Sequence, residues 1–292
     1  SHMEPRFRQY LQEGSQAGVR YALSVPQRVT LGTAGMHVGS RAGSSLEFKD
    51  HREYQSGDDL RRIDWNAYAR SDKLIVKLYR EEINPHLDIV VDGSRSMNLE
   101  DTPKCQVTLG LAALFAEASA NAGYTHAAWI VRNGCEKVAN GANRPHVWDG
   151  IAFDATEPLP ALLNRTPPNW YRQGVRVLIS DLLWMDNPLH TLQHLARNAS
   201  TIYVIQVLAR ADINPEDQGN LCFVDSETGE LREIYVDATV TKRYRERLAQ
   251  HQQNWHVACK QVGARLATVI AEDVVSNWHL DGLLSEEILK LA

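Results

Sequence analysis

The sequence lacks the motifs by which many enzymes and nucleotide-binding proteins are recognised. It contains no glycine-rich phosphate loop of the form G-x-x-x-x-G-K-[ST] or G-x-G-x-x-G, so we do not expect the chain to bind or hydrolyse ATP. No G-x-S-x-G turn surrounds Ser94 or Ser96, which argues against a serine hydrolase. Only four cysteines are present and none belongs to a C-x-x-C pair, so neither a zinc site nor a disulfide is predicted.

Long apolar runs and an excess of positive charge are missing as well. A membrane helix needs roughly 18 uninterrupted apolar residues, whereas the best candidate, Val107–Ala118, is shorter and contains Glu117. The formal net charge of -5 gives no general attraction to nucleic acid or to anionic membranes. Because a secretory leader is also missing, we expect a cytoplasmic protein with reduced thiols, no membrane insertion and no nucleic-acid partner.

The 292 residues fall into two parts of different composition and pattern, and the change occurs near Pro85. Residues 1–85 are charge-dense and punctuated by glycine, and they are predicted to form an N-terminal extension, a β-rich arm of short strands and loops. The first three residues, Ser-His-Met, look like the remnant of a cleaved tag. The short strands of the arm are predicted at Tyr21–Val25, Arg28–Leu31 and Leu74–Tyr79. Residues 86–292 form the second predicted domain.

The second domain is predicted to have an α/β fold, a doubly wound, mostly parallel sheet with helices on both faces. Strands with continuous apolar residues indicate burial on both faces, and the helices between them supply the crossovers that parallel strands require. The predicted strands are Leu87–Val91, His126–Val131, Val175–Ile179 and Thr201–Leu208, and the predicted helices are Pro103–Ala122, Leu159–Asn164 and Pro188–Asn198.

The C-terminal part is predicted to add an antiparallel edge to this sheet. Two strands, Leu221–Val224 and Leu231–Val236, are separated by a segment whose Thr228-Gly229 suits a hairpin turn. The remaining elements predicted are a polar helix at Thr239–Val262, a strand at Arg265–Ile270 and an amphipathic helix at Ser285–Leu291.

Polar residues follow two of the predicted strands at the point where each strand ends. Asp92, Ser94 and Ser96 have the spacing D-x-S-x-S, and Asp181 ends the strand that begins at Val175. In doubly wound sheets ligands lie beyond the carboxyl ends of the strands, so central strands would bring Asp92 and Asp181 side by side. These ligands are all oxygens, which suit Mg²⁺ or Mn²⁺. We therefore predict a divalent-metal site.

The segment Asp92–Met97, with the sequence DGSRSM, resembles the metal-ion-dependent adhesion site of von Willebrand factor A domains, and the strand–helix order around it matches. The resemblance implies that a threonine from a mid-domain loop and an aspartate after a later strand complete the site. Asp181 matches the aspartate, and Thr156 is preferred for the threonine over Thr166, which lies past the next predicted helix. The implied metal ligands are Asp92, Ser94, Ser96, Thr156 and Asp181.

A series of spaced motifs upstream resembles the signature of the family known as domain of unknown function 58. The motifs are Glu47-Phe48, Arg52-Glu-Tyr54, Gly57-Asp-Asp59, Arg61-Arg-Ile-Asp-Trp65 and Ala69-Arg70. This resemblance implies a non-enzymatic binding module that pairs with MoxR-type AAA+ ATPases as an adaptor or co-chaperone. The metal would then be a bridge to an acidic residue of the partner.

Other interpretations stay open at this point. Asp92, Ser94 and Ser96 would also suit a helix N-cap, as would Thr156. A metal-dependent phosphohydrolase or nuclease would use Asp92 and Asp181, with Asp186 and Glu157 as possible helpers.

The acids Asp58, Asp59 and Asp64 could belong to a polymerase or nuclease site. The alternative is that they have a structural role, and we favour that alternative. Arginines alternate with these acids, so we predict ion pairs that attach the N-terminal arm to the α/β domain, with Trp65 as a packing anchor.

Overall fold

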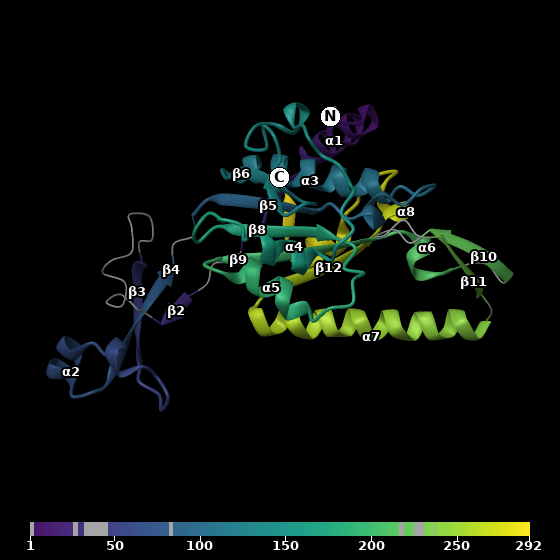
Figure 1. Cartoon of the computed structure of the whole chain (residues 1–292). Coiled ribbons are helices and arrows are strands. Elements are labelled where there is room, and N and C mark those ends of the chain that lie inside the picture. Colours follow the sequence, from purple (N-terminus) through teal and green to yellow (C-terminus); the bar gives the residue numbers. More distant parts are fainter. Residues whose placement is uncertain are drawn as a thin grey trace. The chain divides into compact units, whose positions relative to one another are not determined.

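A six-stranded sheet, five strands of which are parallel, forms the centre of the structure (Figure 1). The computed structural model describes residues 3–25, 29–31, 46–81, 84–215, 219–224, 231–236 and 238–292. The strand order is β12-β9-β8-β5-β6-β7, and β7 pairs antiparallel with β6. The strands are β5 (His86–Asp92), β6 (Thr125–Val131), β7 (Cys135–Lys137), β8 (Val175–Ser180), β9 (Thr201–Leu208) and β12 (Arg265–Ile270). The four strands predicted for the centre of the sheet are confirmed.

The two central strands, β5 and β8, mark the place where the winding of the sheet reverses. From β5 the chain crosses to β6 on one side, and later returns to β8 on the other side. Every residue of β8 and β9 is buried, as their largely apolar sequences predicted, and the polar side chains of Arg176 and Gln206 are buried with them. The carboxyl ends of β5 and β8 therefore border the crevice where doubly wound sheets bind ligands.

Helices cover both faces of the sheet (Figure 1). Helix α3 is buried on nearly all sides, and α5 and α7 pack against each other on the opposite face. The helices of this part are α3 (Lys104–Asn121), α4 (Leu159–Arg165), α5 (Pro188–Ala196), α6 (Arg210–Ile213), α7 (Ala238–Val262), α8 (Ala271–Val274) and α9 (Asp281–Ser285), with short 3-10 turns η2 (Arg95–Asn98) and η3 (Pro145–Val147). The predicted α/β architecture is thus confirmed as a mixed sheet between helical layers.

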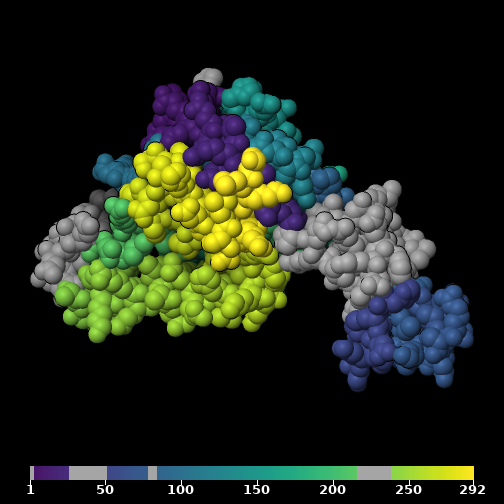
Figure 2. Space-filling view, turned by 180° about the vertical axis from the view of Figure 1, so that it is seen from behind, coloured from purple at the N-terminus to yellow at the C-terminus, as the bar shows by residue number. Residues whose placement is uncertain are grey.

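The first helix, α1 (Pro5–Gly18), also belongs to the α/β unit, which comprises residues 1–24 and 85–292. A Cβ built on Gly14 would lie 1.9 Å from the carbonyl oxygen of Gly110 in α3, so the two helices touch backbone to backbone. Seen from behind, α1 lies against the C-terminal residues (Figure 2), and the Trp278 indole donates to Glu13. The predicted assignment of all of residues 1–85 to one extension therefore differs from the structure.

Replacing Gly14 by alanine is expected to destabilise the protein by about 1–3 kcal/mol, because the added methyl group forces α1 away from α3. This outweighs the gain of up to about 1 kcal/mol from the better helix propensity of alanine. Urea unfolding measures the difference. Gln16→Ala on the exposed side of the same helix is the control, and an equal effect of both changes would refute the close contact.

The segment predicted as a final amphipathic helix, Ser285–Leu291, is instead the end of α9 followed by a strand. Strand β13 (Leu289–Leu291) pairs antiparallel with β1 (Tyr21–Leu23). The prediction was wrong because the partner strand lies far away in the sequence, where a local pattern carries no information about it.

Strands β10 (Gly219–Val224) and β11 (Leu231–Val236) form the predicted antiparallel pair, but as a separate two-stranded sheet. The predicted edge of the central sheet is therefore wrong, and β12 and β7 occupy its two ends. The predicted turn at Thr228-Gly229 lies outside the described residues.

Residues 25–84 form the second unit, which we describe by itself. Its elements are β2 (Val29–Leu31), β3 (Leu46–Glu53), β4 (Ile75–Glu81), the 3-10 turn η1 (Leu60–Arg62) and α2 (Trp65–Ser71), and the sheet order is β2-β4-β3. The strands predicted at Arg28–Leu31 and Leu74–Tyr79 are confirmed as β2 and β4. The strand predicted at Tyr21–Val25 is instead β1 of the α/β unit, and β3 was not predicted.

The charged residues of this second unit pair with one another. Arg52 holds Asp58 through two hydrogen bonds of 2.8 Å, and Arg61 contacts Asp59 at 2.7 Å. That hydrogen bond to Arg61 lowers the pKa of Asp59 to about 2. Trp65, the predicted packing anchor, is 60% exposed. Its ring makes an edge-to-face contact with the ring of Tyr68. These ion pairs order the unit internally. The predicted attachment of the arm to the α/β domain, with Trp65 as its packing anchor, stays a prediction.

Among the described residues, no helix combines the length and the apolar content that crossing a membrane requires.

Candidate metal centre

The loop that follows β5 is held in a tight turn at the carboxyl end of the sheet. A Cβ on Gly93 would lie 2.6 Å from the carbonyl oxygen of Val131 in the neighbouring strand, so glycine is required by close approach of the two backbones. The Gly93 N–H donates to that carbonyl at 2.9 Å. The turn directs Asp92 and Ser94 into the crevice between β5 and β8.

Asp92 is a fully buried carboxylate surrounded by hydroxyl groups. Its Oδ1 accepts hydrogen bonds from the backbone N–H of Ser94 at 2.9 Å and from the Ser94 hydroxyl at 2.5 Å. Its Oδ2 accepts from the Ser180 hydroxyl at 2.6 Å. Within the described part of the chain it forms no ion pair with a cation. Burial, and then the charge of Asp181, raise the pKa of Asp92 to about 6.

The other predicted ligands of this loop lie near Asp92 with different degrees of exposure. Ser94 is buried, Ser96 is half-buried in η2, and Thr156 is exposed. Ala155 forms a parallel bridge with Ser94, so Thr156 directly follows a residue bonded to the loop. Thr166 ends α4 and lies against Gly134. The backbone thus brings the Thr156 segment to the Asp92–Ser96 loop.

Asp181 lies at the end of the adjacent strand, but it already has a cation partner. The Lys104 ammonium, fully buried at the start of α3, contacts Asp181 Oδ2 at 2.8 Å and Asp212 Oδ2 of α6 at 2.9 Å. Burial alone would lower the pKa of Lys104, but the charges of the two aspartates outweigh it and raise the pKa above its usual value. Lys104 is therefore a charged, built-in neighbour of the candidate site.

The turn that carries Asp181 is conformationally unusual. Leu182, buried and in contact with the core, has a φ of 59°, a left-handed backbone that branched side chains adopt at a cost. Its N–H donates to the Ser180 hydroxyl at 3.0 Å, and the Asp181 N–H donates to the Met97 sulfur at 3.1 Å. The two loops of the crevice are thus connected through Ser180 and Met97, and the strained turn holds Asp181 in place.

Taken together, three acids and one ammonium occupy the crevice and its wall. When Asp92, Asp181 and Asp212 are all ionised, Lys104 compensates one of the three negative charges. In the described ranges, no group of three His, Cys, Asp or Glu side chains is arranged to hold a metal ion, so hydroxyl oxygens would have to complete any metal shell. Hydroxyl and carboxylate oxygens are the ligands that Mg²⁺ and Mn²⁺ take.

The chain matches the family described as "Protein of unknown function DUF58" over residues 50–254, more than half of its length. The chain belongs to the DUF58 family.

Relatives of this DUF58 protein include uncharacterized proteins of Mycobacterium bovis and Mycobacterium tuberculosis. Each is 27% identical over 260 residues, which cover 85% of this chain and 81% of the relative. An uncharacterized protein of Mycobacterium avium is 29% identical over 128 residues, 44% of this chain and 73% of the relative.

Among solved structures, the DUF58 chain is similar to the conserved hypothetical protein BatB from Bacteroides thetaiotaomicron, with 12% identity and a TM-score of 0.32 over 69% of this chain and 98% of that one. An aerotolerance-related membrane protein from Bacteroides fragilis gives 10% identity and a TM-score of 0.25 over 61% and 98%. These scores are too low to support an argument about this chain.

Three residues of the crevice escaped the sequence analysis. Ser180 directly precedes Asp181, so its proximity could have been inferred from the strand end. Lys104 opens a helix that is mostly apolar, and a charge in such a helix is a signal of buried pairing. Asp212 carries no local signal, because only the path of the chain after β9 brings it to Lys104.

Proposed function

We propose that the carboxyl end of β5 binds a divalent cation, Mg²⁺ or Mn²⁺, and that this cation joins the protein to an acidic residue of a partner protein. The observation that carries the proposal is Asp92. It is fully buried and ionisable, it is surrounded by hydroxyl oxygens, and among the described residues it has no cation beside it. Burying an unpaired carboxylate is costly, and a bound cation would remove that cost.

The residues around Asp92 fit a hard cation. A hydroxyl that donates its proton to a carboxylate keeps its lone pairs for a metal, and Ser94 donates in this way. Ser94 and Ser96 would bind directly, and Thr156 would enter or leave the shell. Asp181 would act through water or through its remaining lone pairs, because Lys104 and the Leu183 N–H each take one of its oxygens. When bound, the cation supplies a position for a carboxylate of the partner.

As part of the same proposal, the α/β unit is a von Willebrand factor A-like domain and the partner is a MoxR-type AAA+ ATPase or its client. The sequence resemblance of the Asp92–Met97 segment and the parallel strand order support the domain assignment. The protein would serve as an adaptor without catalytic activity.

A phosphohydrolase or nuclease is less well supported by the same residues. Both acids considered as catalytic helpers have other partners, since Glu157 pairs with Arg165 at 2.5 Å and Asp186 contacts His190 at 2.9 Å. Incubation with Mn²⁺ and a panel of phosphoesters and oligonucleotides tests this directly, and turnover lost in Asp92→Ala would favour the enzyme.

Calorimetric titration of Mg²⁺ or Mn²⁺ tests the metal proposal. We expect wild-type protein to take up the metal, and the double variant Asp92→Ala with Ser94→Ala to lose that uptake, because it lacks the buried carboxylate and the hydroxyl that faces it. Asp154→Ala is the matched control, since this half-exposed acid pairs with Arg132 outside the proposed ligand set. Equal uptake by the wild type and the double variant would reject the proposal.

A further inference from the structure

The second and third turns of α7 carry an exposed concentration of positive charge. Lys242, Arg243, Arg245 and Arg247 are exposed, and Glu246 is the one acid between the first and the last of them. None of the four cations forms an ion pair in the part of the chain that the structure describes. We call these four residues the basic face.

Helix stability does not explain the basic face. Arg243 and Arg247 are four residues apart on one side of the helix, where like charges are destabilising. The whole chain has a net charge of -5, so positive charge is not a general property of its surface. In Figure 2 helix α7 lies along an exposed edge of the α/β unit, and the four side chains themselves are exposed.

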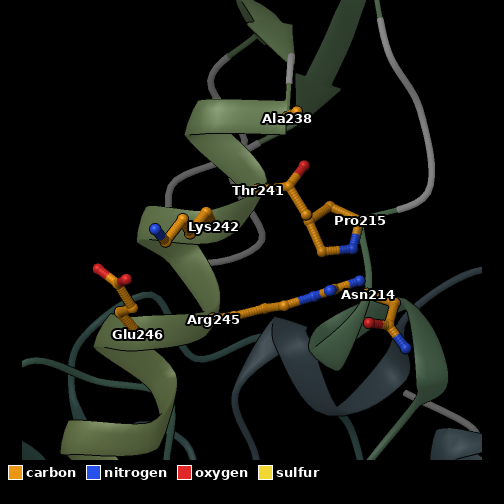
Figure 3. Close-up of a pocket in the computed structure, with 7 residues that line it drawn as sticks. All are labelled: Asn214, Pro215, Ala238, Thr241, Lys242, Arg245 and Glu246. Atoms are coloured by element: carbon orange, nitrogen blue, oxygen red, sulfur yellow. The ribbon is translucent and has the colours of Figure 1, made fainter.

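A polar pocket of about 590 Å³ lies beside the basic face, between α7 and the segment that follows α6. In Figure 3, Arg245 extends from α7 toward Asn214, while Lys242 and Glu246 project from the other side of the helix. Thr241 and Pro215 also line the pocket. The pocket therefore offers guanidinium, amide and hydroxyl donors, which suit the carboxylates of an extended peptide.

Buried contacts connect this pocket to the candidate metal centre. Helix α6, which precedes Asn214, holds Asp212, and Asp212 binds the same Lys104 ammonium as Asp181. On the other side, the Tyr244 hydroxyl of α7 donates to the backbone oxygen of Asp212. Two ion pairs of Lys104, one with Asp212 and one with Asp181, thus connect the segment beside the pocket to the Asp181 turn within one unit.

We propose that the basic face and its pocket bind an acidic segment of a protein partner, one carboxylate of which reaches the metal centre. This inference rests on the proposed function and names the chemistry of the partner. A protein is favoured over a nucleic acid because the residues lining the pocket include no aromatic ring on which a base could stack.

Fluorescence anisotropy with the full chain tests the inference. The probe is a fluorescein-labelled peptide of alternating glutamate and glycine, and the same peptide with glutamine is its uncharged counterpart. We expect Lys242→Glu with Arg245→Glu to weaken binding of the glutamate peptide about tenfold and to flatten its dependence on salt. Lys260→Glu with Lys290→Glu changes the net charge equally at exposed positions elsewhere and should leave binding nearly unchanged.

Three results would overturn the inference. They are equal weakening by both charge-reversed variants, no binding of the glutamate peptide to wild type, and tighter binding of a single-stranded oligonucleotide that requires Lys242 and Arg245. Calorimetric Mg²⁺ uptake by the same variants separates the two proposals. If Lys242→Glu with Arg245→Glu takes up Mg²⁺ normally, any loss of peptide binding belongs to the basic face. If Asp92→Ala with Ser94→Ala takes up as much Mg²⁺ as wild type, the metal proposal alone fails.

Discussion

Replacing Asp92 by asparagine is expected to raise the free energy of unfolding of the metal-free protein at pH 7 by up to about 3 kcal/mol. Burial and the charge of Asp181 raise the pKa of Asp92 to about 6, so the folded state holds this proton more tightly than the unfolded state. The stability that the protonated carboxyl contributes is complete below about pH 4 and is lost as the pH rises through about 6. The asparagine side chain carries no charge, so the variant avoids this loss.

Urea unfolding in EDTA across this pH range measures the effect, and repeating it in Mg²⁺ should reverse the order. Wild type gains the free energy of metal binding, whereas Asp92→Asn gains little. Asp88→Asn is the matched control, because Asp88 is another buried carboxylate of β5, and its contacts are with Trp129, Tyr171 and His86 and not with the loop that carries Ser94. Mg²⁺ should stabilise that variant as it does wild type. A less stable Asp92→Asn protein in EDTA at pH 7 would contradict the expectation.

Replacing Lys104 by methionine is expected to destabilise the protein by about 3–5 kcal/mol, the largest effect we expect from a single substitution. Methionine is of similar length and apolar, so it fills the space without providing a charge. Asp181 and Asp212 then remain as buried carboxylates without their shared cation. Thermal and urea unfolding at neutral pH measure the loss.

Neutralising the two acids in the same background separates charge from packing. Lys104→Met combined with Asp181→Asn and Asp212→Asn should recover most of the lost stability, since the unpaired charges are gone. Lys73→Met removes an exposed lysine whose partner, Glu53, lies 3.4 Å away, and should change stability by less than about 1 kcal/mol. If the triple variant is as unstable as Lys104→Met, the cost arises from packing and the electrostatic explanation is wrong.

The strands of the central sheet were predictable because most of their consecutive residues are apolar, which indicates burial on both faces. The eight residues of β9 are all buried, and their largely apolar sequence, in which Gln206 is the one interruption after Thr201, predicted both bounds of the strand correctly. Helix α3 was predictable for the same reason, since its length and apolar content exclude a strand. Local patterns suffice when an element is surrounded by the core.

Elements that depend on distant partners were not predictable in this way. Helix α1 buries Phe7 and Leu11 on one side, but its closest contact is made by Gly14, a residue that signals no helix by itself. Strand β13 exists because β1 offers backbone partners from the other end of the sequence. A periodic apolar pattern predicts neither the contact of Gly14 with α3 nor the pairing of β13 with β1.

The candidate site shows the same division. The adjacency of Asp92 and Asp181 follows from two strand ends and from the parallel order of the sheet, and it was predictable. The partners that set the electrostatics, Ser180, Lys104 and Asp212, come from three different elements and meet only in the folded chain. Sequence therefore located the crevice but not its charge balance.

The pairing of β1 with β13 also sets the order in which the protein can be completed during synthesis. Strand β1 emerges from the ribosome early, whereas Leu289–Leu291 is translated only after the second unit and the entire central sheet. Until then the edge of β1 presents free backbone donors and acceptors, which favour pairing with other chains. The packing of α1 on α3 can form much earlier, because α3 is finished at Asn121. This glycine contact therefore holds the nascent N-terminal segment in place until its strand partner arrives.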